Sequence, residues 1–90
     1  MAKLYKTNGE IIEIAPENGK KFSLKEAQTY VDGYVERVQL KHREILLCNE
    51  EAICFGLPYN RNATQVLAES YGQGCQPLFG DIIHCMNKEF

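Results

Sequence analysis

The chain has 90 residues, of which 44% are hydrophobic and 24% are charged, a composition typical of folded globular proteins rather than disordered ones. Ten lysines and arginines stand against twelve acidic residues, and the formal net charge of −2 argues against a general nucleic-acid-binding protein, whose affinity depends on neutralising phosphates. No apolar run has the length of a membrane span, and residues 1–7 lack the apolar core of a signal peptide. We therefore expect a single domain over residues 1–90 that stays in the cytoplasm without membrane contact.

The first third of the chain predicts a hairpin followed by a helix. Two short segments, Lys3–Lys6 and Ile11–Ile14, flank Asn8-Gly9, and Asn-Gly is the strongest short-range hairpin signal because both residues tolerate positive φ. Ser23 and Glu26 then have the spacing of a capping box at the start of a helix. The pair Asp32-Gly33 is expected to end that helix.

The remainder predicts a second hairpin, a second helix and a last strand. Tyr34–Leu40 and Glu44–Cys48 are expected strands, and residues 49–56 leave open one more short strand around Ile53–Phe55. Asn60 or Asn62 is expected to cap a second helix that ends at Gly72. A glycine-rich loop over residues 73–80 leads into a strand at Asp81–Met86.

Together these segments predict an α+β fold: a small, mainly antiparallel sheet of about five or six short strands, with two short helices packed on one face. The four cysteines are expected to be free thiols, because they form no CxxC pair and disulfides are rare in a reducing cytosol. Cys48 and Cys85 lie within apolar runs, where a buried cysteine is the usual reading.

Glu36 is unusual for its position in a predicted strand. Alternate residues of a strand share a face, so Glu36 is expected to lie beside the apolar side chains of Tyr34, Val38 and Leu40. A buried carboxylate is costly unless it is paired or hydrogen-bonded. Two interpretations stay open: Glu36 is a structural group with a partner, or it faces a ligand in a pocket lined by Tyr34.

Asn49 and Glu51 end a strand and begin a turn, and they also allow two interpretations. The first is an ordinary solvated turn. The second is a polar rim beside a pocket, with the Asn49 amide hydrogen-bonding a ligand. Acid–base chemistry by Glu50 and Glu51 is disfavoured, because adjacent residues of an extended chain point to opposite faces.

The start of the second helix is the most chemically specific candidate site. Free backbone N–H groups and a partial positive charge make a helix N-terminus a natural place for an anion. Arg61 can add bidentate contacts to a phosphate or carboxylate, and the aromatic Tyr59 is close in sequence. The alternative is simple capping by Asn60 with a solvated Arg61.

The chain carries no recognisable catalytic or metal-binding motif. His42, His84, Cys75 and Cys85 match no zinc-ligand spacing, and adjacent strand residues such as His84 and Cys85 face opposite ways. For the same reason a cysteine–histidine catalytic pair is excluded there. We therefore expect no metal, no cofactor and no enzymatic activity; hydrolysis by Glu36 with a histidine is the least favoured hypothesis.

Three blocks of sequence resemble the phage and mobile-element family called domain of unknown function 3846 (DUF3846): Asp32–Glu36, Ile45–Glu51 and Leu57–Arg61. The segment Gly80–Ile83 is similar to the last strand of that family. The chain departs from the family at Asp32 and Ala52, where glycine is common. This resemblance implies a phage or mobile-element context in a bacterial host, but it implies no biochemical activity.

We therefore expect a small non-enzymatic binding protein that forms a homo-oligomer, since so short a chain buries a small core. The first hypothesis is counter-defence by sequestration of a small anionic nucleotide-like ligand, a host immune signal. Arg61 and the helix start would hold its phosphate while Tyr34 and Tyr59 stack on its base. The second hypothesis is an inhibitor or adaptor that binds a host protein through aromatic anchors on an acidic surface.

Overall fold

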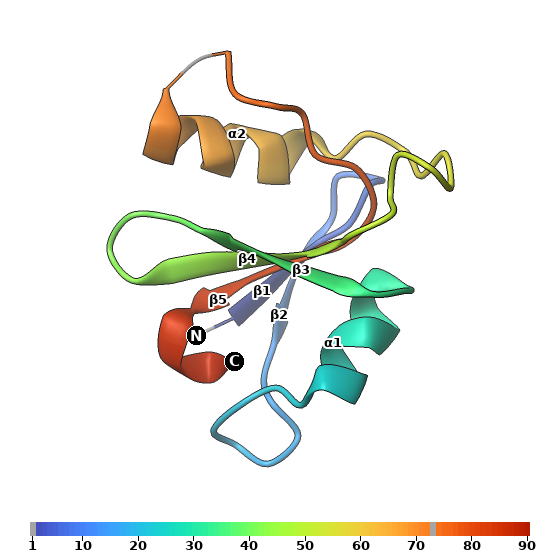
Figure 1. The fold of residues 1–90 in the computed structure, drawn as a ribbon. Helices are drawn as coiled ribbons and strands as arrows, with labels where there is room; N and C mark the ends of the chain where they lie inside the picture. Colours follow the sequence, from blue (N-terminus) through green and yellow to red (C-terminus); the bar gives the residue numbers. More distant parts are fainter. Residues whose placement is uncertain (1, 73) are drawn as a thin grey trace.

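The computed structural model describes residues 2–72 and 74–90; Met1 and Gln73, the first residue of the predicted glycine-rich loop, lie outside it. Along the chain the elements are β1 (Ala2–Tyr5), β2 (Ile11–Ile14), α1 (Leu24–Val31), β3 (Val35–Gln39), β4 (Glu44–Asn49), α2 (Arg61–Tyr71), β5 (Ile82–Met86) and the 3-10 turn η1 (Asn87–Glu89) (Figure 1). The predicted strands and helices are present, and the ends of the strands differ from the prediction by at most one residue.

The strands form one five-stranded sheet in the order β2-β1-β5-β4-β3, and every neighbouring pair is antiparallel. Strands from opposite ends of the chain meet at its centre, where Leu4 pairs with Ile83. The predicted α+β fold, an antiparallel sheet with two helices, is confirmed. β2 and β3 form the two edges of the sheet.

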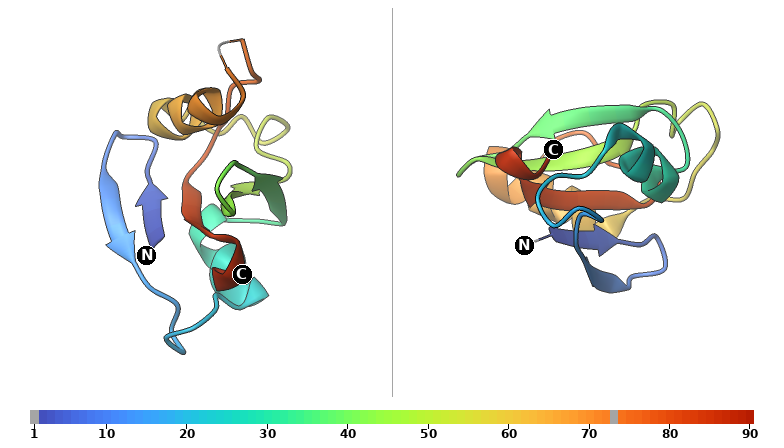
Figure 2. Two further views of the ribbon diagram at one scale, coloured as in Figure 1. Left: turned by 90° about the vertical axis from the view of Figure 1, so that its left-hand side faces the viewer. Right: turned by 90° about the horizontal axis from the view of Figure 1, so that it is seen from below.

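The two helices cover opposite faces of the sheet (Figures 1 and 2), so the prediction that both pack on one face is wrong. The reason lies in the central strands. The run Ile45–Cys48 of β4 and the pair Ile82–Ile83 of β5 are buried throughout, and a strand that is apolar on both sides needs a covering layer on each.

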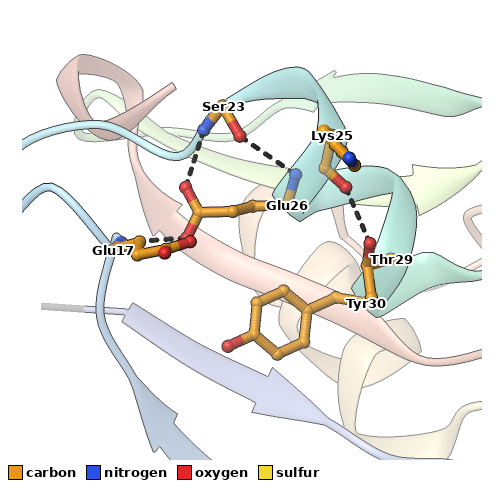
Figure 3. A pocket seen from close by; sticks show the side chains of 6 residues that line it. All are labelled: Glu17, Ser23, Lys25, Glu26, Thr29 and Tyr30. Atoms are coloured by element: carbon orange, nitrogen blue, oxygen red, sulfur yellow. Dashed lines mark hydrogen bonds between the residues drawn. The ribbon is translucent and has the colours of Figure 1, made fainter.

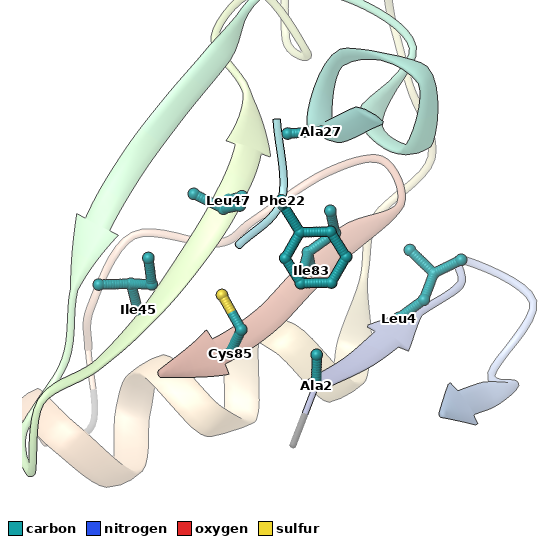
Figure 4. Packing of buried hydrophobic residues seen from close by; sticks show 8 residues of the cluster. All are labelled: Ala2, Leu4, Phe22, Ala27, Ile45, Leu47, Ile83 and Cys85. Carbon is teal, nitrogen blue, oxygen red and sulfur yellow. The ribbon is translucent and has the colours of Figure 1, made fainter. Parts of the chain in front are cut away.

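Ala27 of α1 packs on one face, against the cluster drawn in Figure 4: Ala2, Leu4, Phe22, Ile45, Leu47, Ile83 and Cys85. Ala63 and Leu67 of α2 pack on the other face, against Tyr5, Leu40, Leu46, Cys48 and Ile82. We call these the α1 face and the α2 face. All four cysteines are free, and burial raises the pKa of the Cys48 and Cys85 thiols to about 12.

Local signals in the sequence set the ends of α1. Ser23 Oγ accepts from the N–H of Glu26, and the Glu26 carboxylate accepts from the N–H of Ser23, which is the predicted capping box. The helix ends at Asp32-Gly33 as predicted, but Asp32, with φ of 62°, is the left-handed residue. Aspartate tolerates this conformation better than most residues, although glycine adopts it most easily.

Residues 50–60 form the β4–α2 loop, and the extra strand around Ile53–Phe55 is absent from it. The segment consists of turns closed by backbone bonds such as Phe55 N–H to Glu51 O (3.0 Å). Ile53 and Phe55 are exposed, so no burial of alternate side chains favours a strand here. No helix in the described part of the chain is long and apolar enough to cross a membrane.

Candidate functional site

The segments that carry the family resemblance meet at one end of the sheet, on the right in Figure 1. Asn49, the last residue of β4, is buried, and its Nδ2 donates to the carbonyl oxygens of Val31 and Asp32, each at 3.1 Å. Its Oδ1 accepts from the N–H of Glu51 at 2.8 Å. One amide therefore holds the end of α1, the end of β4 and the start of the β4–α2 loop together.

Asn60 has the same role at the other end of that loop. Its side chain is fully buried, and Nδ2 donates to the carbonyl oxygens of Tyr5 and Gly80, each at 2.8 Å. Its Oδ1 accepts from the N–H of Ala63 at 3.0 Å, so Asn60, and not Asn62, caps α2. Both amide hydrogens are used within the protein.

Two glycines let the backbone approach these junctions closely. A Cβ on Gly33 would lie 2.6 Å from Asn49 Nδ2, and a Cβ on Gly80 would lie 2.9 Å from Leu57 Cδ1. Neither space admits a larger residue without movement of its neighbour. The geometry thus favours the structural interpretation of Asn49 and Asn60, whose bonds fix both ends of the loop between them.

A shallow hollow of about 380 Å³ opens beside the end of α1. It is lined by Tyr34 and Phe55, both exposed, and by the carboxylates of Asp32 and Glu51, with Gln28 and Gly33 completing it. The predicted site residues Tyr34 and Glu51 therefore lie together. Arg61 and Glu36 are not part of this hollow.

A second hollow, of about 270 Å³, lies on the other side of the β4–α2 loop and shares Glu51 with the first. Glu36 lines it and is exposed, so the prediction that Glu36 is a buried carboxylate is wrong. β3 is an edge strand, and Val38 of this face packs against the α2-face cluster, whereas Glu36 stays open. The expected pocket containing both Tyr34 and Glu36 does not form.

Together the two hollows make up what we call the acidic apolar surface. Its large apolar residues are Tyr34, Ile53, Phe55, Leu78 and Phe79, and its acidic residues are Asp32, Glu36, Glu50 and Glu51. No lysine or arginine lines either hollow among the described residues. Tyr59 extends the aromatic part, since its ring meets that of Phe79 edge-on at a centroid distance of 6.0 Å.

Arg61 lies in a different place, at the hairpin between β1 and β2. It lines a hollow of about 300 Å³ together with Lys6, Asn62 and Gln65. Asn62 Nδ2 donates to the carbonyl of Gly9 at 3.2 Å and ties α2 to the hairpin loop. Neither of the predicted stacking tyrosines lines this hollow, so the structure divides the predicted site residues between two regions.

Another hollow, of about 490 Å³, lies between α1 and the loop before it (Figure 3). Its polar groups already bond one another: Glu26 accepts from the N–H groups of Ser23 and Glu17, and Thr29 Oγ1 donates to Lys25 O. The bonds from those two N–H groups hold the pKa of the Glu26 carboxyl below its usual value. The side chains of Glu17, Lys25 and Tyr30 make no hydrogen bond within the described residues, so these three groups remain open to a ligand.

Sequence reasoning missed a chain of polar side chains on the α2 face. Tyr5 Oη lies 2.8 Å from His84 Nδ1, and His84 Nε2 lies 2.6 Å from Glu44 Oε1. Burial raises the pKa of the Tyr5 hydroxyl, and the nearby carboxylates of Glu44 and Glu69 raise it further. The three residues meet only because β1 and β4 both pair with β5. This cluster lines none of the hollows above.

His84 and Cys85 point to opposite faces of β5, as expected for neighbours in a strand: Cys85 belongs to the α1-face cluster, and His84 bonds groups of the α2 face. Within residues 2–72 and 74–90, no group of three or more histidine, cysteine, aspartate or glutamate side chains is placed to hold a metal ion.

Comparison with known proteins adds the family of the chain. No curated protein and no solved structure matches it. The profile of the family described as a domain of unknown function, DUF3846, matches residues 4–89. That match spans the second half of β1, the other four strands and both helices, including the two asparagine junctions. The chain therefore belongs to the DUF3846 family.

Proposed function

We propose that the chain is a non-enzymatic binding protein of phage or mobile-element origin, and that it acts by docking onto a protein of the bacterial host. The acidic apolar surface carries this proposal. Tyr34, Ile53 and Phe55 are 65%, 64% and 63% exposed, and large apolar side chains that gather on a surface mark interaction sites. Aromatic residues are also enriched among the residues that dominate binding energies.

The charges around these side chains indicate the charge that a complementary partner carries. Among the described residues, four carboxylates and no cation line the two hollows, so a complementary partner presents an apolar side chain flanked by lysines or arginines. Asn49 and Asn60 hold both ends of the β4–α2 loop. A surface that is already ordered loses less entropy when a partner binds.

The surroundings of the candidate catalytic groups support a function without chemistry. The Glu36 carboxylate forms no hydrogen bond or ion pair with another described residue, so nothing in the described part of the chain orients it as a base. His84 already bonds Tyr5 and Glu44 and lines neither hollow. General acid–base catalysis needs such groups within hydrogen-bond reach of a bound substrate.

The test uses the purified chain as bait for host proteins, with variants that separate specific capture from general stickiness. We expect Phe55→Ser and Glu50→Lys each to weaken capture of a stoichiometric partner at least tenfold. Leu24→Ser removes an equally exposed apolar side chain on α1, away from the surface, and should leave capture unchanged. Titration calorimetry with the purified partner then measures the affinities. Equal capture by all four proteins would refute the proposal.

Sequestration of a small anionic nucleotide-like ligand, a host immune signal, is the second candidate. Its supporting observation is the hollow where Lys6 and Arg61 lie at the start of α2, since two cations and a helix N-terminus suit a phosphate. Tyr34 lies among carboxylates in another hollow, which gives this candidate less support than docking. Calorimetry against cyclic and linear nucleotides, with Arg61→Gln as the comparison, tests it; no heat from any nucleotide would exclude it.

A further inference from the structure

The two edge strands of the sheet differ in how their free backbone groups are used. In an antiparallel pair, residues alternate between those whose N–H and C=O point to the neighbour and those that point outward. In β3, Leu40 N–H bonds Glu44 O of β4, so the groups of Gln39 point outward. In β2, the bond from Lys6 N–H to Glu10 O means that Ile11 and Glu13 point outward.

The outer edge of β3 is guarded. The outward carbonyl of Gln39 accepts a hydrogen bond from the hydroxyl of Tyr71 at the end of α2. Arg37, the next outward residue, donates to the backbone and side chain of Asn87 and lies over the Phe90 ring at 5.8 Å. Bulky charged side chains of this kind are a common protection against pairing with another strand.

The outer edge of β2 has no such protection (Figure 2, left, where β2 is the outermost strand). In the described part of the chain, no hydrogen bond reaches the backbone groups of Ile11 or Glu13 on that side. The strand contains no lysine, arginine or proline, and its one charged residue is Glu13. Ile11 and Ile12 are 54% and 39% exposed. Ile12 lies opposite Leu4 on the α1 face and Ile11 opposite Tyr5 on the α2 face, so apolar surface is open on both sides of the edge.

We propose that β2 pairs antiparallel with β2 of a second copy of the chain, so that the two sheets continue into each other across a two-fold axis. This inference does not depend on the docking proposal, which concerns the acidic apolar surface. The second copy fits the edge because a two-fold axis requires one strand to complement itself. The sequence of β2, Ile-Ile-Glu-Ile, meets that requirement when the axis lies at Ile12.

In that register the axis passes beside Ile12. The outward N–H and C=O groups of Ile11 then pair with those of Glu13 in the second copy, and the outward groups of Glu13 pair with those of Ile11 in the second copy. These bonds satisfy all the free backbone groups of the two residues. The two Ile12 side chains meet across the axis on the α1 face. Centring the axis on Glu13 would place two like charges opposite each other, which is destabilising.

The contact is small, because β2 has four residues. Small interfaces are typically weak, so we expect a dimer that forms with a dissociation constant on the order of 100 μM. Sedimentation equilibrium of the full chain over about 5–500 μM should therefore show the mass rising from that of a monomer toward that of a dimer.

Substitutions then locate the interface. Ile12→Lys places two like charges across the axis and should raise the dissociation constant at least tenfold. Glu13→Pro removes an outward N–H without touching the bonds to β1, and should have the same effect. Leu24→Lys makes the same change at an exposed site on α1 and should leave the constant unchanged. Circular dichroism and urea midpoints confirm that each variant is folded.

A wild-type chain that stays monomeric to 500 μM would overturn this proposal. Dimers that persist in folded Ile12→Lys and Glu13→Pro would overturn it as well. If Phe55→Ser, and not a change in β2, abolishes the dimer, then self-association occurs through the acidic apolar surface instead. That outcome would leave β2 as an unpaired edge.

Discussion

The N-termini of the two helices satisfy their unpaired backbone N–H groups in different ways. At the start of α2, Asn60 is buried and makes three bonds with a neutral amide. At the start of α1, Ser23 is exposed, and the Glu26 carboxylate makes the reciprocal bonds. Both solve the problem of unpaired N–H groups at a helix N-terminus, but one does so in the interior and the other in water.

This difference separates residues that fix the shape of the molecule from residues that only stabilise a helix. Water can replace the partners of Ser23 and Glu26 when these are lost, whereas no water reaches the groups that Asn60 bonds. Asn60 and Asn49 both flank the β4–α2 loop, whose side chains make much of the acidic apolar surface. We therefore expect changes at the asparagines to affect both stability and binding.

The largest expected effect is that of Asn60→Ala. It leaves the buried carbonyl oxygen of Gly80 and the N–H of Ala63 without partners and removes one of the bonds to the Tyr5 carbonyl, and we expect a loss of about 3 kcal/mol in the free energy of unfolding. Ser23→Ala, the matched change at the exposed cap, should cost about 1 kcal/mol. Urea unfolding of both variants measures the two values. Equal losses would show that burial does not distinguish the two caps.

The next effect concerns the close contact between Gly33 and Asn49. Gly33→Ala forces its Cβ against the amide, 2.6 Å from Nδ2, and should cost about 2 kcal/mol. In the background of Asn49→Ala the clash is gone, so the same change should cost less than half as much. A double-mutant cycle by urea unfolding gives the coupling energy. Additive losses would mean that the backbone moves to relieve the contact.

A smaller effect is expected at the half-buried polar chain. Tyr5→Phe removes the hydroxyl bonded to His84 but keeps the Tyr5 carbonyl that Asn60 bonds, so it should cost about 1 kcal/mol. The spectra of residues 50–60 in heteronuclear NMR should stay unchanged, because the Asn60 junction is intact. Shifts throughout that loop would indicate that the polar chain also supports the β4–α2 loop.

Local signals explain which parts of the fold were predictable. The turn at Asn8-Gly9 and the Ser23–Glu26 capping box each depend on residues within a few positions, and each formed as expected. Of the two expected caps of α2, Asn60 or Asn62, the structure selects Asn60. The face that α2 covers was not predictable from its own spacing. That choice follows from the burial of β4 on both sides, which requires the strand order.

Only part of the candidate site was predicted, because its residues come together through contacts between segments distant in the sequence. Tyr34 and Glu51 were recognised, but they meet only because the β4–α2 loop folds back over the end of α1. Glu36 was expected on a buried face because it alternates with apolar residues along β3. Alternation alone does not show that this end of the strand is left uncovered. His84 gave no signal at all, since its partners Tyr5 and Glu44 come from strands far apart in the sequence.

The smallest effect is the pH dependence of the α1 cap. The N–H groups of Ser23 and Glu17 lower the pKa of Glu26, so its charged form stabilises the folded state above its unfolded pKa of 4.5. That stabilisation is lost as the pH falls through 4.5 and then through the lower folded value. Glu26→Gln keeps one accepting oxygen but no charge, so the difference in unfolding free energy between wild type and this variant should shrink from about pH 6 to about pH 3.

The deficit of Asn60→Ala should stay constant over that range, because a buried neutral amide binds no proton. A deficit that varied with pH as steeply at Asn60 as at Glu26 would mean that charge, and not burial, governs both helix starts.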